Sequence, residues 1–350
     1  MAAERAQIAG LVRSIYPGED IAKIDHASMD VGVLSNVMQI DVHRESGVTA
    51  LIAKFPRPEF PMMRPMFAVE AAFYTKTDQS RVPFRLATVL SASADAIVLA
   101  KLDNVKSYTC YDGCPAERVP AITRKLAQMH AVHWDLAFPE LAEVPGIGAN
   151  LSVDDKQTKF KSLFEPFLAD LGLDKATQAA VEDMCKWLSI GKRLTRLHDT
   201  VESWHKSLIH GDFHVANMLF QGDSIFVLDW ATCGASNPLR DLAFFFTVSV
   251  TADVRAAEEA RSLRAYADIL AAAVPDVSVA EVESMYFHCV LNQFVILVGY
   301  NALTMSLAGL GATPAKQAQL RDGFLETNRR SCMAAVHAFT KVKDELEEQQ

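Results

Sequence analysis

The chain lacks several features that would assign it to other classes of protein. Acidic side chains outnumber basic ones by 43 to 34, for a formal net charge of −9. It therefore lacks the basic excess that nucleic acids and anionic membrane surfaces attract. Its six cysteines include one close pair, Cys110 and Cys114, whereas a zinc ribbon needs two such pairs. The N-terminal stretch has no apolar signal-peptide core. We expect reduced thiols, a cytoplasmic location, and no nucleic-acid or membrane partner.

One apolar run, residues 286–310, is long enough to span a bilayer. It carries His288, Asn292 and Gln293, however, and polar groups in that number cost several kcal/mol in lipid. The run is therefore predicted to be a buried helix of a globular protein.

The secondary-structure signals change near residue 103. Strand-like alternation dominates before this point and helical periodicity after it. The predicted elements are a helix over 1–25, strands over 31–42 (two, joined by a tight turn), 48–55, 84–91 and 96–102, and helices over 66–77, 120–134, 150–205 and from 241 onward. The fold class expected is α+β, with a small antiparallel sheet lobe (1–103) and a larger, mostly helical lobe (104–350).

The segment from His210 to Trp230 has the sequence HGDFHVANMLFQGDSIFVLDW. It contains most of the candidate catalytic and metal-binding residues. Its two short apolar runs predict a hairpin, which would bring Asn217 and Asp229 to the same end of a sheet. Two carboxylates and an amide at these spacings suit phosphoryl transfer, because one carboxylate can accept the proton of an attacking hydroxyl and an oxygen pair can hold Mg²⁺. Asp212 is the candidate base, and Asn217 and Asp229 are the candidate metal ligands.

Neighbouring residues of this segment are assigned supporting roles. Asp212 alone would be a turn residue bonded to its own backbone, and its spacing to Asn217 and Asp229 favours the base instead. His210 is expected to brace the Asp212 loop by hydrogen bonds. Asp241 is expected to cap the helix that it begins, to brace the same loop, or both.

Two further features point to a nucleotide site in the small lobe. Lys54 ends a predicted strand and Glu70 lies on the following helix, so a Lys–Glu pair could aim the ammonium at phosphates. The stretch GVLSN, with Gly32, Ser35 and Asn36, could form the turn that covers those phosphates. It has few glycines, and the chain has no G-x-x-x-x-G-K-[ST] motif.

A zinc site is the alternative chemistry for the same residues. His210 and His214 flank Asp212, and HAVH supplies His130 and His133. A zinc hydrolase built on this group would need a second ligand cluster at fixed spacing, which the sequence does not offer convincingly.

At this point the residues resemble a known family. HGDFHVANMLF with VLDW downstream looks like the aminoglycoside phosphotransferase and choline kinase-like family. The segments DLAFFF, AITRKLAQMHAVHW and MFAVEAAFYTKT are similar to other parts of that family, the last of them to its ecdysteroid kinase-like branch. The resemblance implies a two-lobed, protein-kinase-like fold and an enzyme that phosphorylates a hydroxyl of a small molecule with ATP and Mg²⁺.

The resemblance also implies roles for individual residues. Asp212 would be the catalytic base, Asn217 and Asp229 the magnesium ligands, and Lys54 and Glu70 the phosphate-orienting pair. The phosphate loop would run from Gly32 to Asn36. The hinge would be Ile97 to Leu102, pairing with adenine through its backbone, with Ala100 and Leu102 as the nominated contacts. Relatives often carry Glu-Asp at the hinge, where this chain has IVLAKLDN, which bears on nucleotide affinity and on ATP-versus-GTP preference.

Two questions remain open at the sequence level. A catalytically inactive nucleotide-binding pseudokinase would share the fold, although every expected polar group is present here. The acceptor is expected to be a small-molecule alcohol, and the aromatic residues from Phe244 to Phe246 favour a lipophilic one. Acidic groups for a polycationic acceptor are limited to the nominated Asp135 and Glu140.

Overall fold

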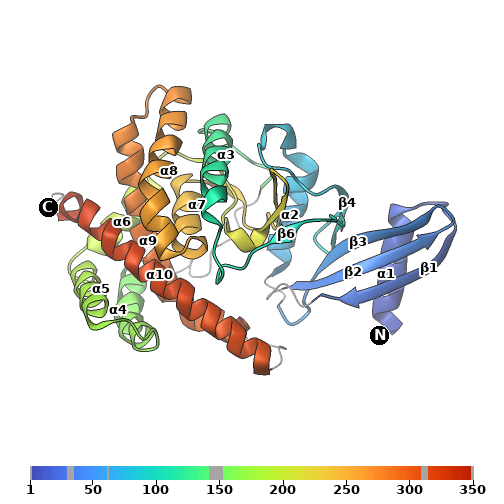
Figure 1. The fold of residues 1–350 in the computed structure, drawn as a ribbon, viewed down its shortest axis with the longest axis horizontal. Helices are drawn as coiled ribbons and strands as arrows, with labels where there is room; N and C mark the ends of the chain where they lie inside the picture. Colours follow the sequence, from blue (N-terminus) through green and yellow to red (C-terminus); the bar gives the residue numbers. More distant parts are fainter. Residues whose placement is uncertain (1, 30–34, 61–62, 142–152, 309–313, 348–350) are drawn as a thin grey trace.

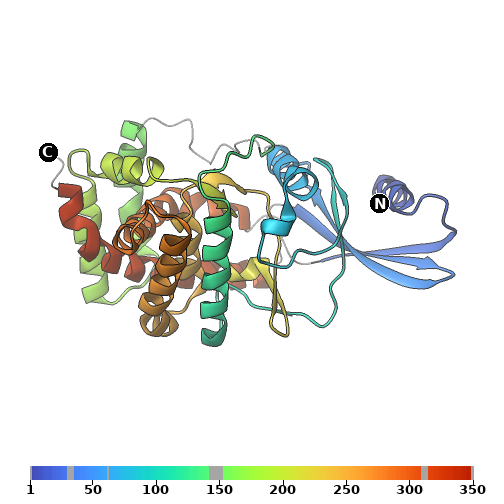
Figure 2. The same cartoon turned by 90° about the horizontal axis from the view of Figure 1, so that it is seen from above.

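The fold was analysed in a computed structural model that describes residues 2–29, 35–60, 63–141, 153–308 and 314–347. The molecule is elongated, with a sheet and one helix at the N-terminal end and a compact group of helices at the other (Figure 1). Turning the view by 90° shows the same division, with α2 between the sheet and the helical part (Figure 2).

The small lobe is built on a five-stranded antiparallel sheet with the order β1-β2-β3-β5-β4. Helix α1 packs on this sheet through Ile8 and Val12, which join Ile40, Val42 and Leu51 in a core of their own. The elements are α1 (Ala2–Ile15), β1 (Ile21–Ser28), β2 (Ser35–Arg44), β3 (Gly47–Pro56), α2 (Arg64–Lys76), β4 (Val89–Ala92) and β5 (Ile97–Ala100).

The N-terminal elements differ from their prediction. The first helix ends at Ile15, because the Pro17-Gly18 pair that follows breaks it and Gly18 adopts a φ of 78°. The first strand is Ile21–Ser28, whose first five residues fall within the predicted helix over 1–25, and it pairs with β2. Of the predicted strand over 84–91, only Val89 onward joins the sheet. Its earlier part, at Arg85, bridges instead to Phe226 in the large lobe.

Helix α2 lies between the sheet and the helical lobe. Pro65 occupies its first turn, where a missing N–H costs nothing. Its buried residues, among them Phe67, Phe73 and Tyr74, belong to the main hydrophobic core of the large lobe rather than to the core between α1 and the sheet. That core also includes Ile97 of β5, and α2 contacts β4 as well, so α2 links the sheet to the large lobe.

The large lobe combines two small antiparallel sheets with a group of helices. β6 (Lys106–Ser107) pairs with β8 (Met218–Gln221), which pairs with β9 (Ser224–Val227), while β7 (Ser207–Ile209) pairs with β10 (Gly234–Ser236). The helical elements are α3 (Val119–Val132), α4 (Val153–Ala169), α5 (Lys175–Leu188), α6 (Arg193–Glu202), α7 (Leu239–Phe244), the π-helix η5 (Phe245–Ser249), α8 (Ala252–Ala273), α9 (Val279–Ala308) and α10 (Pro314–Glu347).

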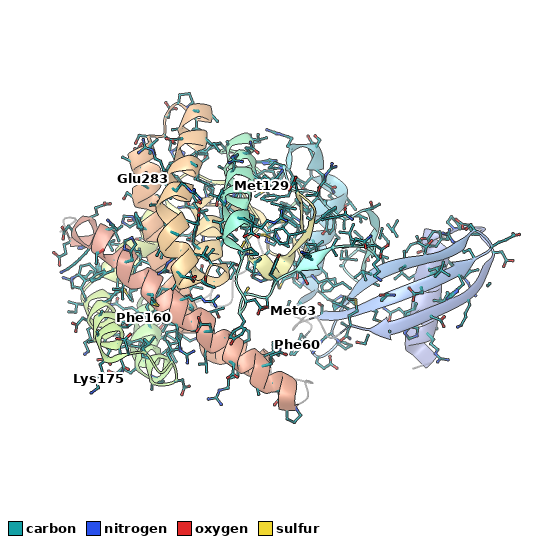
Figure 3. All side chains as sticks on the ribbon, viewed as in Figure 1. Phe60, Met63, Met129, Phe160, Lys175 and Glu283 are labelled. Carbon is teal, nitrogen blue, oxygen red and sulfur yellow. The ribbon has the colours of Figure 1, made fainter. Side chains whose placement is uncertain are left out.

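The helices of the large lobe enclose two clusters of apolar side chains. Met129 of α3 lies in the larger cluster and Phe160 of α4 in the smaller one, next to α5 (Figure 3). The predicted helices over 120–134 and 150–205 match α3 and the group α4, α5 and α6.

Helix α9 contains the apolar run. Val279–Gly299 has the length and mean hydropathy, 1.3, of a membrane span, and 56% of the scored window is buried inside the protein. It packs against α10, α7, α4, α8 and α6, as a core helix of the large lobe does.

Candidate active site

The β8–β9 hairpin brings the two candidate metal ligands together. Asn217 immediately precedes β8 and Asp229 follows the residue after β9, and the N–H of Leu228 donates to the carbonyl of Asn217 at 2.9 Å. Asn217 and Asp229 therefore emerge at the same end of the hairpin, as the two short apolar runs predict. Asp229 has a φ of 63°, a left-handed conformation that is uncommon for a residue with a side chain.

Lys54 joins the small lobe to this end of the hairpin. Its Nζ donates to Glu70 Oε2 at 2.9 Å and to Asp229 Oδ1 at 2.5 Å. Burial alone would lower the pKa of Lys54, but the two carboxylates outweigh it and raise the pKa above its ordinary value. Burial raises the pKa of Glu70, which is 1% exposed, and the Lys54 ammonium opposes that shift. Lys54 is thus a cation held between two acidic side chains.

Asp212 lies on the loop before the hairpin and is oriented by its neighbours. Asn217 Nδ2 donates to its carbonyl at 3.0 Å and to its Oδ2 at 3.1 Å, and His214 Nε2 is 3.3 Å from the same Oδ2. Burial raises the pKa of Asp212, but His214 and the amide of Asn217 lower it by more than burial raises it. The net pKa therefore lies below its usual range. The side chain is 41% exposed, so an ionised carboxylate faces the solvent side of the site.

His214 is the charged partner of Asp212. Burial lowers the pKa of His214, but the Asp212 carboxylate outweighs it, with a further contribution from the Cys110 thiol, and the net pKa is well above the usual value. Its ring lies 6.0 Å from that of Phe244 at the end of α7. His214 is a candidate zinc ligand from the sequence alone, and only the fold of the loop reveals its pairing with Asp212.

Asp241 braces the loop that carries Asp212 through hydrogen bonds to its backbone. Its two carboxylate oxygens accept the backbone N–H groups of His210 at 2.6 Å and Gly211 at 2.9 Å. Of its two expected roles, bracing is the one observed: α7 begins at Leu239 with Pro238 at the N-cap. Gly211 has a φ of 82°, and a Cβ at this position would meet the Thr232 carbonyl at 2.3 Å. A side chain at position 211 would therefore force this loop away from the turn that carries Thr232.

His210 connects the loop to the residue before Asp229. Its Nδ1 accepts the Asp212 N–H at 3.2 Å, so Nε2 carries the proton and donates to the Leu228 carbonyl at 2.9 Å. The ring is thus held as the neutral tautomer. The bracing role expected of His210 agrees with these contacts.

The predicted phosphate loop and hinge are described in part. Gly32 lies outside the described residues. Ser35 and Asn36 are the first residues of β2, paired with Pro56 and Phe55, rather than members of a turn, because the ladder with β3 continues to its end. Val37 stands opposite Lys54 in this ladder, so the start of β2 lies beside the lysine.

At the hinge, the N–H of Ala100 donates to the Thr88 carbonyl at 2.8 Å and that of Lys101 to Ala50 at 3.1 Å. Both N–H groups donate within the sheet. Of the two nominated residues, Leu102 is therefore the better placed to donate its N–H to an adenine ring.

The histidines do not form a zinc site. His130 Nδ1 contacts the Tyr266 hydroxyl at 2.6 Å, and His133 Nδ1 contacts the Met129 carbonyl at 2.8 Å. Within the described ranges, no group of three or more His, Cys, Asp or Glu side chains is arranged to hold a metal ion. Magnesium requires fewer protein ligands, because it retains water and binds substrate phosphates.

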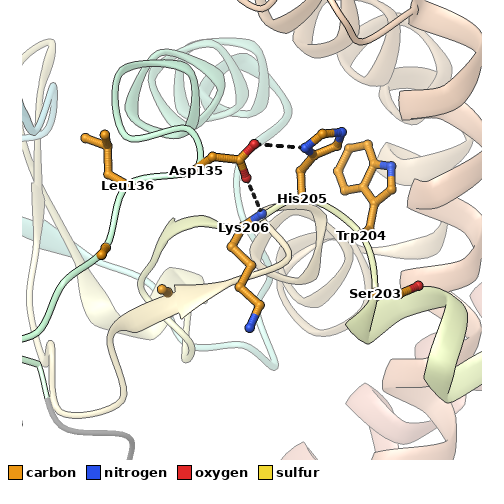
Figure 4. Close-up of a pocket in the computed structure, with 8 residues that line it drawn as sticks. Asp135, Leu136, Ser203, Trp204, His205 and Lys206 are labelled. Atoms are coloured by element: carbon orange, nitrogen blue, oxygen red, sulfur yellow. Dashed lines mark hydrogen bonds and ion pairs between the residues drawn. The ribbon is translucent and has the colours of Figure 1, made fainter.

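The acidic residues nominated for a cationic acceptor have other contacts. Asp135 Oδ2 is 3.0 Å from His205 Nδ1, and its Oδ1 accepts the Lys206 N–H at 3.0 Å (Figure 4). These residues line an open cavity of about 540 Å³ together with Trp204. Glu140 accepts from the Thr77 hydroxyl at 3.4 Å.

Solved structures with the same arrangement of lobes define the class of fold. A choline kinase from Cryptosporidium parvum Iowa II matches with a TM-score of 0.52 and 10% identity, over 98% of this chain and 97% of that one. A Plasmodium vivax ethanolamine kinase matches with a TM-score of 0.53 and 11% identity, over 95% and 86%. An ADP-bound aminoglycoside phosphotransferase matches with a TM-score of 0.50 and 11% identity, over 93% of this chain and 99% of that one. The two-lobed, protein-kinase-like fold expected from the sequence is thereby confirmed.

The sequence narrows the class to one family. The model of the ecdysteroid kinase-like family matches residues 49–279, and the chain belongs to this family. No curated protein sequence matches the chain. The resemblance inferred from the motifs is thus confirmed, and the family is one of kinase-like phosphotransferases related in fold to small-molecule kinases.

Proposed function

We propose that this protein transfers the terminal phosphoryl group of ATP, with Mg²⁺, to a hydroxyl group of a small molecule. Two observations carry the proposal. Lys54, Glu70 and Asp229 form one group of ion pairs. Asp212 and Asn217 are hydrogen bonded to each other at the end of the hairpin that carries Asp229. This set combines a cation for phosphates, hard oxygen ligands for a metal and an ionised carboxylate for a hydroxyl proton.

Each side chain has a distinct task in this proposal. The acceptor oxygen forms a bond to the γ-phosphorus while the bond from that phosphorus to the bridging oxygen of ADP breaks. Asp212 accepts the hydroxyl proton at a carboxylate oxygen, and its lowered pKa keeps that carboxylate ionised. Lys54 holds phosphate oxygens, and Glu70 fixes the direction of the ammonium.

The residues present fit a magnesium ion. Asn217 engages Asp212 through its NH₂ group, which leaves the amide oxygen as a ligand, and Asp229 adds a carboxylate. When bound, the ion would neutralise phosphate charge during transfer.

The acceptor is proposed to be an uncharged alcohol. Phe245, Phe246 and Tyr286 are fully buried in the core, so they cannot line an acceptor site. Phe244 is partly exposed beside His214 and offers an apolar contact near Asp212. We also propose that the lobes divide near residue 103 and that the protein is cytoplasmic.

ATP turnover with and without a library of alcohols tests the proposal. Asp212→Asn is expected to lower turnover by about 10²- to 10⁴-fold, as loss of a general base does, while Asp183→Asn, an exposed carboxylate on α5, keeps wild-type turnover. Equal turnover in wild type and Asp212→Asn would contradict the role of Asp212. Nucleotide binding with no transfer to any alcohol would favour the pseudokinase.

A further inference from the structure

Trp230, the residue after Asp229, is the centre of a group of contacts that the function above does not use. Its side chain is fully buried, and its Nε1 donates to the Val227 carbonyl at 3.2 Å. The indole therefore folds back against the strand that leads to Asp229. This contact fixes one side of the turn that carries the candidate metal ligand.

On its other side, Trp230 packs against α2. Its ring stacks on that of Phe73, with centroids 4.0 Å apart and planes 8° from parallel, and Phe73 is also fully buried. Burial raises the pKa of Glu70, three positions before Phe73 on the same helix, and the backbone of Trp230 is among the groups that oppose that shift. Trp230 thus packs on α2 through its ring.

Trp230 also contacts the loop that carries Asp212. The ring of His210 lies 4.7 Å from it, and His210 donates to Leu228 on the other side of Asp229. Asp229 is therefore flanked by two residues that are each fixed to other elements, Leu228 to the Asp212 loop and Trp230 to α2. Such support is required to keep a non-glycine residue in a left-handed conformation.

We propose that Trp230 and Phe73 are positioning residues that hold the Asp229 carboxylate in the geometry needed for metal-assisted nucleotide binding. The inference rests on the proposed function and adds that Asp229 is held in place by packing between α2 and the large lobe. Because Trp230 and α2 share the main core and their rings stack, the residue after Asp229 is fixed to the helix that carries Glu70, and Lys54 is the member of the group that the sheet contributes.

The test measures ADP binding by calorimetry with and without Mg²⁺ in wild type, Trp230→Leu, Phe73→Leu and Trp230→Phe. Removal of support behind a metal ligand typically weakens metal affinity by about 10- to 100-fold. Trp230→Leu and Phe73→Leu are therefore expected to reduce the gain in ADP affinity from Mg²⁺ about tenfold, with metal-free affinity retained. Trp230→Phe, which keeps a ring to stack on Phe73, is expected to restore most of the gain.

Trp187→Leu is the matched control, because Trp187 packs on Phe339 in the other core cluster, and it should keep the wild-type gain. If Trp230→Leu does not fold, Phe73→Leu tests the same stack from its other member. The inference would be overturned if Mg²⁺ increased ADP affinity equally in wild type and both leucine variants. It would also be overturned if Trp187→Leu reduced that increase as much as they do. No effect of Mg²⁺ on ADP binding in wild type would instead contradict the proposed function itself.

Discussion

The sheet with α1 and the rest of the molecule differ in what holds them together. Ile8, Ile40 and Leu51 form a small core between α1 and the sheet. The main core runs from α2 through the β8–β9 hairpin to α8 and α9. The candidate site lies at the boundary, with Lys54 on the sheet and Asp212 and Asp229 on the large-lobe side. The candidate site therefore combines side chains of the large lobe with Glu70 of α2 and Lys54 of the sheet.

Removing a large aromatic residue from the main core is expected to have the largest effect. Phe246 is fully buried between Phe245 and Tyr286, and Phe246→Ala should lower the free energy of unfolding by about 3–5 kcal/mol. Tryptophan fluorescence measures this change, because the four tryptophans lie at positions 134, 187, 204 and 230. Hydrogen exchange should accelerate in α2 as well, since α2 shares that core. Unchanged protection of α2 would separate it from the large lobe.

A truncation in the sheet core should have a smaller and more local effect. Leu51 is fully buried between α1 and the sheet, and Leu51→Ala is expected to cost about 2–5 kcal/mol in the protection of β2 and β3 against hydrogen exchange. The fluorescence-detected unfolding of the large lobe should move much less. Equal shifts in both measurements would show that the two cores unfold as one unit.

The smallest predicted effect concerns pH. The pKa of Asp212 is lowered in the folded protein, so the folded state favours its ionised form. The corresponding stability is present above the unfolded pKa of about 3.9 and is lost as pH falls below that value toward the folded pKa. As the pH falls below about 4, the free energy of unfolding of Asp212→Asn should therefore decrease less than that of wild type. Urea unfolding at several pH values checks this, with Asp183→Asn as the control for loss of one carboxylate. Parallel curves for wild type and Asp212→Asn would contradict the prediction.

The sequence was sufficient for the fold class, the family and the local hairpin. Short apolar runs bounded by turn residues predict the hairpin strongly, and hydrogen bonds within it then determine where Asn217 and Asp229 emerge. The spacing from Lys54 to Glu70 is likewise a local strand-to-helix signal, and the structure brings the two side chains to 2.9 Å.

Contacts between distant segments were not predictable from local pattern. Nothing in the neighbourhood of Phe73 or Trp230 indicates that their rings stack, because the two residues are brought together only by the fold. The strand Ile21–Ser28 was missed for a different reason: its charged and polar residues, Lys23, Asp25 and His26, weakened the alternation, and pairing with β2 stabilises it nonetheless. The prediction that Ser35 and Asn36 form a turn failed because the β2–β3 ladder extends through them.

The most direct test of the central claim is the magnesium dependence of ATP turnover in wild type and Asp229→Asn. Product ADP is followed by ³¹P NMR as Mg²⁺ is raised at fixed ATP. Wild type is expected to require Mg²⁺, and Asp229→Asn to lose most of the turnover at every Mg²⁺ concentration, because the carboxylate opposite Lys54 is gone. Turnover by Asp229→Asn that follows the wild-type curve would contradict the assignment of this hairpin as the phosphoryl-transfer site.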